Sequence, residues 1–382
     1  MGAPMKICIV GGGPAGLYFA ILMKQLDPSQ EITILERDGP NDTFGWGIVF
    51  SDQTFGYLES SDAPSFTRIV ESCQTWDNVD IVHHGEKVSI HGNRFSGIAR
   101  LAFLNILHAR CRELGVDVRF GTNITDRTQL PPHDLLVGAD GANSLLRQWF
   151  SDGLRPTIDR RKNRYIWLGT PRLFHGLTLT FHATEAGPFA SHAYKFSETA
   201  STFIVECAEE TWARAELEGK SGEETCAYLE EVFADDLHGE PLLTNNFVRW
   251  INFPLVKNQH WQDGNVVLLG DALHTAHFSI GSGTKLALED AIALAQAFEA
   301  NPRIDAALPA FERARKAIVD RLQDAAESSL VWFEQMGDYL HLPPLPFAYE
   351  AMTRSGRVDR EKLRKRDPKF VAAYERGAAN DD

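Results

Sequence analysis

The chain has few of the features that define disulfide scaffolds and metal sites. Its 382 residues include only five cysteines, and no two of them form a C-x-x-C pair. Scattered cysteines indicate reduced thiols rather than a disulfide framework or a zinc site. We therefore expect no bound metal, and we interpret Cys8 and Cys207, which lie in apolar runs, as core residues.

Long apolar runs and an excess of positive charge are also missing. No stretch contains the roughly 20 apolar residues that span a membrane, and the N-terminus has no signal-peptide pattern. The formal net charge of -14 argues against nonspecific binding to nucleic acid or to an anionic membrane. We expect a cytoplasmic protein without either partner, although a local basic pocket could still bind an anionic ligand.

What the sequence does contain is a glycine-rich turn between an apolar strand and a helical pattern, in residues 6–17. Gly11 permits the tight turn, Gly13 lets the backbone approach a pyrophosphate, and Gly16 lets the helix pack against the strand. A second apolar strand ends at Glu36, where a carboxylate can accept hydrogen bonds from ribose hydroxyls. The pattern predicts a dinucleotide site without specifying which nucleotide binds.

The pattern of strands and helices changes twice along the chain. Strands alternate with helices up to about residue 164, which predicts a parallel sheet. Between Tyr165 and Ala208, short strands separated by turn residues predict an antiparallel sheet. An apolar strand at 265–269 then returns to the first pattern, and the chain is mainly helical from Thr284 onward. Ligand sites tend to lie where two such domains meet.

Two Gly-Asp sites follow apolar strands further along the chain, at Gly138-Ala139-Asp140-Gly141 and at Gly270-Asp271-Ala272. Gly281-Ser282-Gly283 then opens a helical pattern. Taken singly, either aspartate could be a helix cap or a turn residue. In this order, the three motifs resemble those of single-component aromatic hydroxylases of the para-hydroxybenzoate hydroxylase type, and the resemblance covers nearly the whole chain.

The resemblance implies one bound flavin adenine dinucleotide (FAD) and assigns residues to it. Glu36 would bind the adenosine ribose, Arg100 the phosphates or the ribityl chain, and Asp271 the ribityl chain. Asp140 would hold a loop shared by the flavin and the nicotinamide. The helix that opens after Gly281 would direct N–H groups at the flavin N1/O2 locus. The remaining expected cofactor contacts are Gly11, Gly13, Gly16, Arg37, Gly47, Val49 and Gly283.

The fold class implied is α/β, with a Rossmann-like FAD-binding domain interrupted by an antiparallel-sheet substrate domain and followed by C-terminal helices. The expected boundaries are 1–75, 96–164 and 255–300 for the FAD-binding domain, 76–95 and 165–254 for the substrate domain, and 301–382 for the C-terminal helical region.

A narrower resemblance links the chain to flavin hydroxylases that act on salicylyl-CoA and anthraniloyl-CoA and to the violacein-pathway hydroxylase. Many other relatives have a proline before the late glycines, where this chain has Phe278-Ser279-Ile280. The segments that carry the resemblance are 44–52, 165–170, 192–194, 201–207 and 277–285, and residues 353–358 with Arg366-Asp367-Pro368 look more like the CoA-thioester enzymes.

The chemistry implied by the family begins with hydride transfer from NADH or NADPH to FAD. Reaction with O2 then gives a C4a-hydroperoxyflavin, whose distal oxygen attacks an electron-rich ring carbon. The most specific expectation is 5-hydroxylation of an aromatic acyl-CoA thioester such as salicylyl-CoA or anthraniloyl-CoA. No second dinucleotide motif is visible, so the nicotinamide is expected to bind transiently at the domain cleft.

A base that polarises the ring substituent would assist this reaction. Period-two alternation places Ala190, His192, Tyr194 and Phe196 on one face of a strand. If that face lines the cleft, His192 and Tyr194 are the catalytic candidates; otherwise they are ordinary sheet residues.

Four further residues are candidates for substrate binding. Trp46 and Phe50 could contact the aromatic ring or could belong to the core. Arg160 and Arg161 lie in a basic cluster that could bind CoA phosphates or could be a solvated loop. If they bind CoA, neutralising both should raise the KM for a CoA thioester and spare the flavin content.

Three alternative functions remain open. The chain could hydroxylate an indole- or tryptophan-derived metabolite. It could be a flavin-dependent halogenase, although Trp250-Ile251-Asn252-Phe253-Pro254 lacks the second tryptophan of the W-x-W-x-I-P motif. A flavin-bound interaction or redox-sensing protein is the third possibility, and the scattered cysteines give it no support.

Overall fold

The computed structural model describes residues 4–245 and 248–378, and its first layer is a six-stranded sheet that carries the glycine turn. The strand order is β15-β16-β9-β1-β2-β8, and all neighbours are parallel except β15 and β16. The bounds are β1 (Lys6–Val10), β2 (Glu31–Leu35), β8 (Asp117–Arg119), β9 (Leu135–Gly138), β15 (Gln262–Asp263) and β16 (Val266–Leu268). The parallel order places the carboxyl ends of β1, β2, β9 and β16 at one edge, where ligands bind in such sheets.

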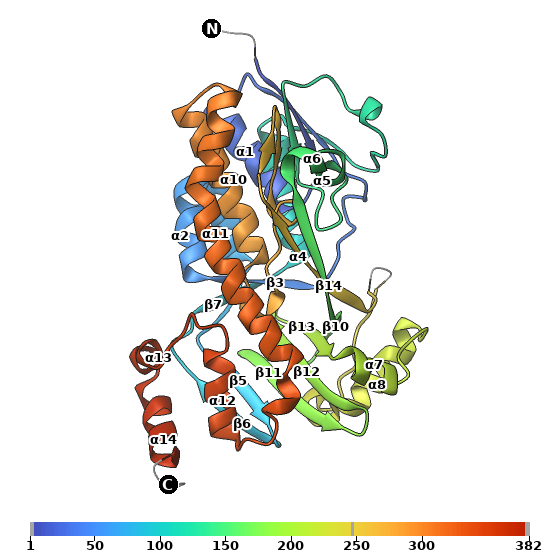
Figure 1. The fold of residues 1–382 in the computed structure, drawn as a ribbon, viewed down its shortest axis with the longest axis vertical. Coiled ribbons are helices and arrows are strands. Elements are labelled where there is room, and N and C mark those ends of the chain that lie inside the picture. The colour runs from blue at the N-terminus through green and yellow to red at the C-terminus, as the bar shows by residue number, and fades with distance from the viewer. Residues whose placement is uncertain (1–3, 246–247, 379–382) are drawn as a thin grey trace.

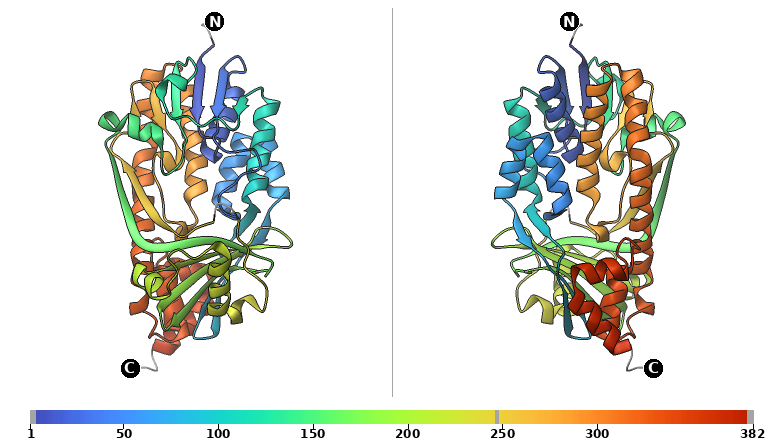
Figure 2. Two further views of the ribbon diagram at one scale, coloured as in Figure 1. Left: turned by 90° about the vertical axis from the view of Figure 1, so that its right-hand side faces the viewer. Right: turned by 90° about the vertical axis from the view of Figure 1, so that its left-hand side faces the viewer.

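Helices cover this sheet because the strands are apolar on both faces. Helix α1 packs along α10 and α4 (Figure 2). Leu17, Phe103 and Leu288, one from each of these helices, are buried in one core cluster with the strand residues. The bounds are α1 (Pro14–Leu26), α4 (Arg100–Glu113), α5 (Leu145–Trp149), α6 (Ser151–Leu154) and α10 (Gly283–Ala300). The predicted helix after the late glycines is confirmed.

A seven-stranded sheet forms the second domain, in the order β14-β10-β13-β12-β11-β5-β6. The bounds are β5 (Val79–His83), β6 (Glu86–Ile90), β10 (Pro156–Thr170), β11 (Leu177–Thr184), β12 (Gly187–Lys195), β13 (Ser201–Cys207) and β14 (Ile251–Asn258). The predicted antiparallel pairing is confirmed except that β5 pairs with β11 in parallel. A long connection rather than a hairpin separates β5 from β11, which is what a parallel pair requires.

The two faces of this second sheet are covered differently. One face packs under three short helices, α7 (Glu209–Arg214), α8 (Gly222–Val232) and α9 (Ala234–Leu237), around Phe203 and Phe233. Helices α11 (Ile304–Glu334) and α12 (Pro344–Thr353) pack against part of the opposite face, around Phe181 and Phe347. The rest of that opposite face, including Tyr165, His192 and Ile204, lines a cavity together with residues of the first domain.

A small third sheet lies between the two larger ones, with strand order β3-β7-β4. Its bounds are β3 (Gly47–Ser51), β4 (Gln74–Trp76) and β7 (Phe95–Ala99), and two helices, α2 (Asp52–Ser61) and α3 (Ala63–Glu71), follow β3. Residues 47–51 form a strand because they pair with β7, whose residues lie almost fifty positions further along the chain.

The C-terminal region is helical, as predicted. Helix α11 (Ile304–Glu334) is long enough to run beside both domains, and α12 (Pro344–Thr353), α13 (Arg360–Arg366) and α14 (Pro368–Ala378) follow it (Figure 1). The proposed boundaries at 164/165 and 254/255 fall inside β10 and β14, two strands that extend from one domain to the other. Residues 1–3, 246–247 and 379–382 of the proposed domains lie outside the described part. Within the described part, no helix combines the length and apolarity that a membrane span requires.

Candidate active site

The glycine turn has the geometry that a bound pyrophosphate needs. Gly11 has a φ of +105°, and a Cβ there would lie 2.2 Å from the carbonyl oxygen of Ala139. A Cβ on Gly16 would lie 2.4 Å from the carbonyl oxygen of Gly11. By contrast, a Cβ on Gly13 would meet no atom within 4 Å, and no side chain caps the N-terminus of α1. The uncapped N–H groups of the first helical turn thus face open space, which suits a phosphate.

Glu36 lies beside this turn, at the end of β2. Its Oε2 accepts a hydrogen bond from the amide of Gly12 at 2.6 Å, and its Oε1 accepts one from the amide of Asp38 at 2.9 Å. These bonds fix the carboxylate next to the glycines, where a ribose would follow the pyrophosphate. Arg37 is mostly exposed and pairs with Asp38 at 3.3 Å. Both residues remain proposed contacts for the adenosine end.

The loop after β9 is held by the side chains of Asp140 and Arg147. Asp140 Oδ2 accepts hydrogen bonds from the amides of Leu145 and Leu146, at 2.7 and 3.2 Å. Arg147 is buried and donates to the carbonyl oxygens of Ala142 and Ala272, which ties this loop to the loop that carries Asp271. The Oδ1 atom of Asp140 is buried without a partner among the described residues. Asp140 therefore accepts the first two N–H groups of α5, whose N-cap is Ser144, and holds the loop, while Arg147 has a structural role.

Arg100 and Asp271 form the centre of the cofactor half of the site. Both line the cavity, and the Nε of Arg100 is buried without a hydrogen-bond partner among the described residues. Burial lowers the pKa of Arg100, and the nearby carboxylate of Asp271 opposes that shift. The guanidinium, with its unpartnered Nε, suits a phosphate, and the carboxylate that lines the cavity beside it suits a hydroxyl group of the same ligand. These residues therefore fit the phosphates and ribityl chain of FAD.

The flavin-ring end is built by residues that follow Asp271. Gly281 has a φ of +60°, and a Cβ there would lie 3.2 Å from Cγ1 of Val49 on β3. Helix α10 begins at Gly283 without a side-chain cap, and residues 281–285 line the cavity. Gly47 begins β3 and has no room for a side chain, since a Cβ would lie 2.7 Å from Phe196. The N-terminus of α10 thus offers N–H groups and a positive dipole end to a planar ring.

One cavity of about 1030 Å³ connects this cofactor half with the seven-stranded sheet. That volume is at the upper end for small-molecule sites, as expected for a site that takes both a cofactor and a substrate. The substrate half has mainly apolar and aromatic walls, formed by Phe44, Val79, Tyr165, Trp167, Leu177, Leu179, Ile204, Phe253, Phe278, Met352 and Val358.

His192 and Tyr194 both line the cavity, so the predicted alternation along β12 is confirmed, and Ala193 between them packs into the opposite core. Tyr194 donates its hydroxyl proton to the carbonyl oxygen of Gly47 at 2.9 Å, and burial raises its pKa. Tyr194 thus fixes strand β3 rather than accepting a proton. His192 Nε2 lies 3.4 Å from Glu206 Oε2, and burial lowers the pKa of this imidazole, which is neutral at pH 7.

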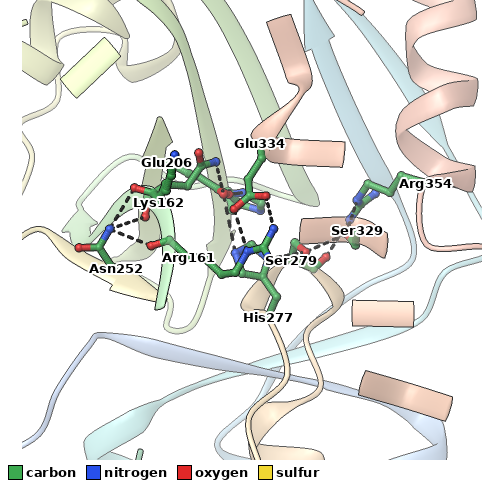
Figure 3. Close-up of polar contacts among 11 residues, drawn as sticks. Arg161, Lys162, Glu206, Asn252, His277, Ser279, Ser329, Glu334 and Arg354 are labelled. Carbon is green, nitrogen blue, oxygen red and sulfur yellow. Dashed lines mark hydrogen bonds and ion pairs between the residues drawn. The ribbon is translucent and has the colours of Figure 1, made fainter. Parts of the chain in front are cut away.

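A buried polar network that links Glu206, His277, Ser279, Ser329 and Arg354 was missed by the sequence analysis (Figure 3). Glu206 Oε1 accepts a hydrogen bond from Asn163 at 3.1 Å and lies 3.7 Å from Nε2 of His277. The chain of contacts continues through Ser279 and Ser329 to the guanidinium of Arg354, with successive distances of 2.8, 2.8 and 2.9 Å. Although burial raises the pKa of Glu206, His277, His192 and Asn163 together hold it below its usual value.

One member of this network had a sequence signal and the others did not. Glu206 is a carboxylate inside a strand whose seven residues are all buried, and charged residues are almost never fully buried unless they are paired. Ser329 lies in α11 and Arg354 directly follows α12, and nothing in their local sequence connects them with Glu206.

None of the four residues predicted to bind substrate is among the described residues that line the cavity. Phe50 is buried and packs on Phe55 and Phe103, and Trp46 packs against the backbone of Gly169. Arg161 is engaged by Glu334 and Asp159, and Arg160 is exposed near Asn143. The basic cluster is a bulge in β10, where Asn252 binds the carbonyl groups that leave the ladder (Figure 3). Trp46, Phe50 and Arg161 therefore contribute packing and ion pairs to the fold, while Arg160 lies at the surface outside the cavity lining.

Replacing Arg161 with Gln is expected to destabilise the protein without changing substrate affinity. Its guanidinium donates to both carboxylate oxygens of Glu334, at 3.0 and 2.5 Å, and joins β10 to α11. Loss of this charge-assisted pair should lower the free energy of unfolding by roughly 1–3 kcal/mol. Urea unfolding measures that loss, and Arg160→Gln is the matched control with the same change of charge. A higher KM for a thioester substrate in Arg161→Gln alone would contradict this assignment.

Comparison with known proteins supports FAD as the cofactor of this protein. The family model described as "FAD binding domain" matches residues 4–326. The chain is 41% identical to a salicyloyl-CoA 5-hydroxylase of a Streptomyces species, over 96% of this chain and 72% of the relative. The chain belongs to the FAD binding domain family and is a flavin-dependent aromatic monooxygenase. The resemblance deduced from the ordered glycine and aspartate motifs is thereby confirmed.

Two other relatives match this monooxygenase over nearly its whole length. It is 36% identical to a protodeoxyviolaceinate monooxygenase of Chromobacterium violaceum, over 92% of this chain and 95% of the relative. It is 37% identical to a 3-hydroxy-4-methyl-anthranilyl-[aryl-carrier protein] 5-monooxygenase of Streptosporangium sibiricum, over 93% and 95%. The solved structure of 2-methyl-3-hydroxypyridine-5-carboxylic acid oxygenase has the same fold, with a TM-score of 0.67 at 21% identity over 96% of this chain and 98% of that one.

Proposed function

We propose that this monooxygenase hydroxylates an electron-rich aromatic ring that is carried as an acyl thioester, with salicyloyl-CoA and anthraniloyl-CoA as the first candidates. The observation that carries the proposal is the continuous cavity that runs from the N-terminus of α10 past His192 and on between apolar walls. Two relatives support the thioester, because their names specify a CoA ester and a carrier-protein ester of hydroxy- or amino-substituted benzoates. The expected product is the 5-hydroxylated thioester.

The cofactor half would hold FAD through residues that the sequence already indicated. Glu36 would bind the adenosine ribose, the turn at Gly13 the pyrophosphate, and Arg100 with Asp271 the phosphates and ribityl chain. When bound, the flavin supplies the reduced ring that activates O2 for transfer to the substrate. NADH or NADPH is the proposed source of electrons. The N-terminus of α10 stabilises negative charge on the ring, and the aromatic walls around Phe278 and Trp167 exclude water.

His192 is the proposed base toward the substituent of the substrate ring. Its Nε2 faces Glu206, which leaves Nδ1 as the nitrogen for a phenol or an aniline. A neutral imidazole can accept a proton from that group as the ring becomes electron-rich. The carboxylate of Glu206 then stabilises the imidazolium that forms, while Asn163 and His277 hold Glu206 in place.

The purified flavoprotein should oxidise NADH faster when salicyloyl-CoA is present and should release a hydroxylated thioester. Oxygen uptake, NADH absorbance and mass spectrometry of the product measure this without any added reductase. Free salicylate is the control for the thioester, and indolic compounds test the alternative suggested by the relative that acts on protodeoxyviolaceinate. Turnover only with an added flavin reductase and halide would support the halogenase instead. No stimulation by any aromatic thioester would contradict the proposal.

A further inference from the structure

The substrate end of the cavity opens at a rim that carries three arginines from separate parts of the chain. Arg94 lies between β6 and β7, Arg357 lies between α12 and α13, and Arg366 ends α13. All three are exposed and all three line the cavity. We refer to them as the arginine rim.

The charge at this rim is opposite in sign to that of the whole protein. Among the described residues that line the cavity, only Asp77 and Asp271 are acidic, and Asp271 belongs to the cofactor half. Asp77 lies 3.5 Å from the imidazole of His91. Arg354 adds a fourth cation just inside the rim. A local positive cluster on a protein with a net charge of -14 concentrates anionic ligands at this opening.

The rim is held in place by contacts between its two halves. Arg366 Nη1 donates to Asn93 Oδ1 at 2.9 Å, and the amide of His91 donates to Asp367 Oδ2 at 2.9 Å. Gly92 has a φ of +76°, and a Cβ there would lie 2.7 Å from the carbonyl oxygen of Arg366. The loop at 91–94 is thus packed directly on the end of α13. A docked loop positions its cations before a ligand arrives, which reduces the cost of binding.

The walls inside the rim match a long, weakly polar arm. Val358 and Met352 line the same cavity as the arginines, together with Val79 and Leu177, which pair with each other, and Leu179, which pairs with His192. Anionic groups would remain at the exposed rim, while an aromatic group at the other end of the ligand would reach the imidazole. Arginine suits this task because its planar fork binds phosphate oxygens in pairs.

We propose that Arg94, Arg357 and Arg366 form the binding site for the phosphate groups of a CoA-type thioester, whose pantetheine arm passes Val358 and Met352 to present the aromatic ring to His192. This inference rests on the proposed thioester substrate. It replaces Arg160 and Arg161, which lie outside the cavity lining, with a different set of cations.

The test compares salicyloyl-CoA with a thioester that lacks the phosphorylated nucleotide of CoA. The KM of the wild-type holoenzyme and of the Arg357→Gln, Arg366→Gln and double variants is measured with salicyloyl-CoA and with salicyloyl-pantetheine, which carries no phosphate. We expect the KM for salicyloyl-CoA to rise about 5-fold for each single variant and about 20-fold for the double variant, with little change for salicyloyl-pantetheine. The effect should shrink in high salt because the rim is exposed. Arg160→Gln, with the same loss of charge, should leave both KM values unchanged, and the flavin content should stay at the wild-type level in all variants.

Several results would overturn the proposal. Equal effects on the two thioesters would show that the arginines do not recognise phosphate. A higher KM for NADH with an unchanged KM for salicyloyl-CoA would assign the rim to the nicotinamide cosubstrate. If the wild type turns over neither thioester, the proposed function fails, but titration of the holoprotein with CoA alone still tests the site. Weaker CoA binding by the double variant would support the rim, and absence of CoA binding by the wild type would refute it.

Discussion

Gly11→Ala is expected to give a protein that folds poorly and purifies without flavin. The φ of +105° is unfavourable for any residue with a side chain, and the new Cβ would lie 2.2 Å from the carbonyl oxygen of Ala139. The backbone strain alone costs about 1–2 kcal/mol, and the overlap with a buried strand end adds to it. We expect the free energy of unfolding to fall by about 3 kcal/mol or more, a large part of the roughly 5–15 kcal/mol that stabilises a domain. Urea unfolding and flavin absorbance measure the two losses.

Gly13→Ala is the matched control, because it separates cofactor binding from folding. A Cβ on Gly13 would meet no protein atom within 4 Å. The variant should therefore unfold like the wild type, but its methyl group would stand where the pyrophosphate approaches the N-terminus of α1. We expect at least a 100-fold higher Kd for FAD, which corresponds to about 2.7 kcal/mol. Full flavin content in Gly13→Ala would mean that the phosphates do not bind at this turn, and wild-type stability of Gly11→Ala would contradict the steric argument.

The cofactor half could be predicted from sequence because local rules determine its parts. Each motif comes directly after an apolar strand, and parallel pairing then brings Gly11, Glu36, Asp140 and Asp271 to one sheet edge. Neither long-range contacts nor side-chain detail were needed for that inference. The same local reasoning identified the cavity-facing side of β12 from its alternation.

The substrate half could not be predicted in the same way, because contacts between distant segments create it. Arg366 and Asn93 are 273 residues apart in the chain, and their hydrogen bond helps to shape the rim. The basic cluster at 160–164 was conspicuous in sequence, yet Glu334 engages Arg161 from a helix 173 residues further along. A cluster of like charges in sequence therefore says little about which arginines face a ligand.

Glu206→Gln is expected to lower kcat by about 10²-fold without loss of flavin. Glu206 approaches both His192 and His277 and is buried with them. Without its carboxylate, the imidazolium that forms when His192 accepts the substrate proton loses its stabilising partner, while the positive charge of Arg354 remains nearby. General acid–base assistance typically contributes 10²–10⁴-fold. Single-turnover rates of product formation measure this loss independently of flavin reduction.

The pH profile distinguishes this role from a purely structural one. Burial already lowers the pKa of His192, so the rate of the wild type should fall only on the acid side of pH 6.5, as the imidazole becomes protonated. The Glu206 carboxylate favours the protonated form, so its removal should lower the pKa of His192 further and move the acid limb to lower pH. Glu334→Gln makes the same chemical change at a carboxylate that binds Arg161 instead, and it should reduce stability while leaving the acid limb in place. An unchanged acid limb in Glu206→Gln would show that His192 is not the group whose protonation limits the reaction.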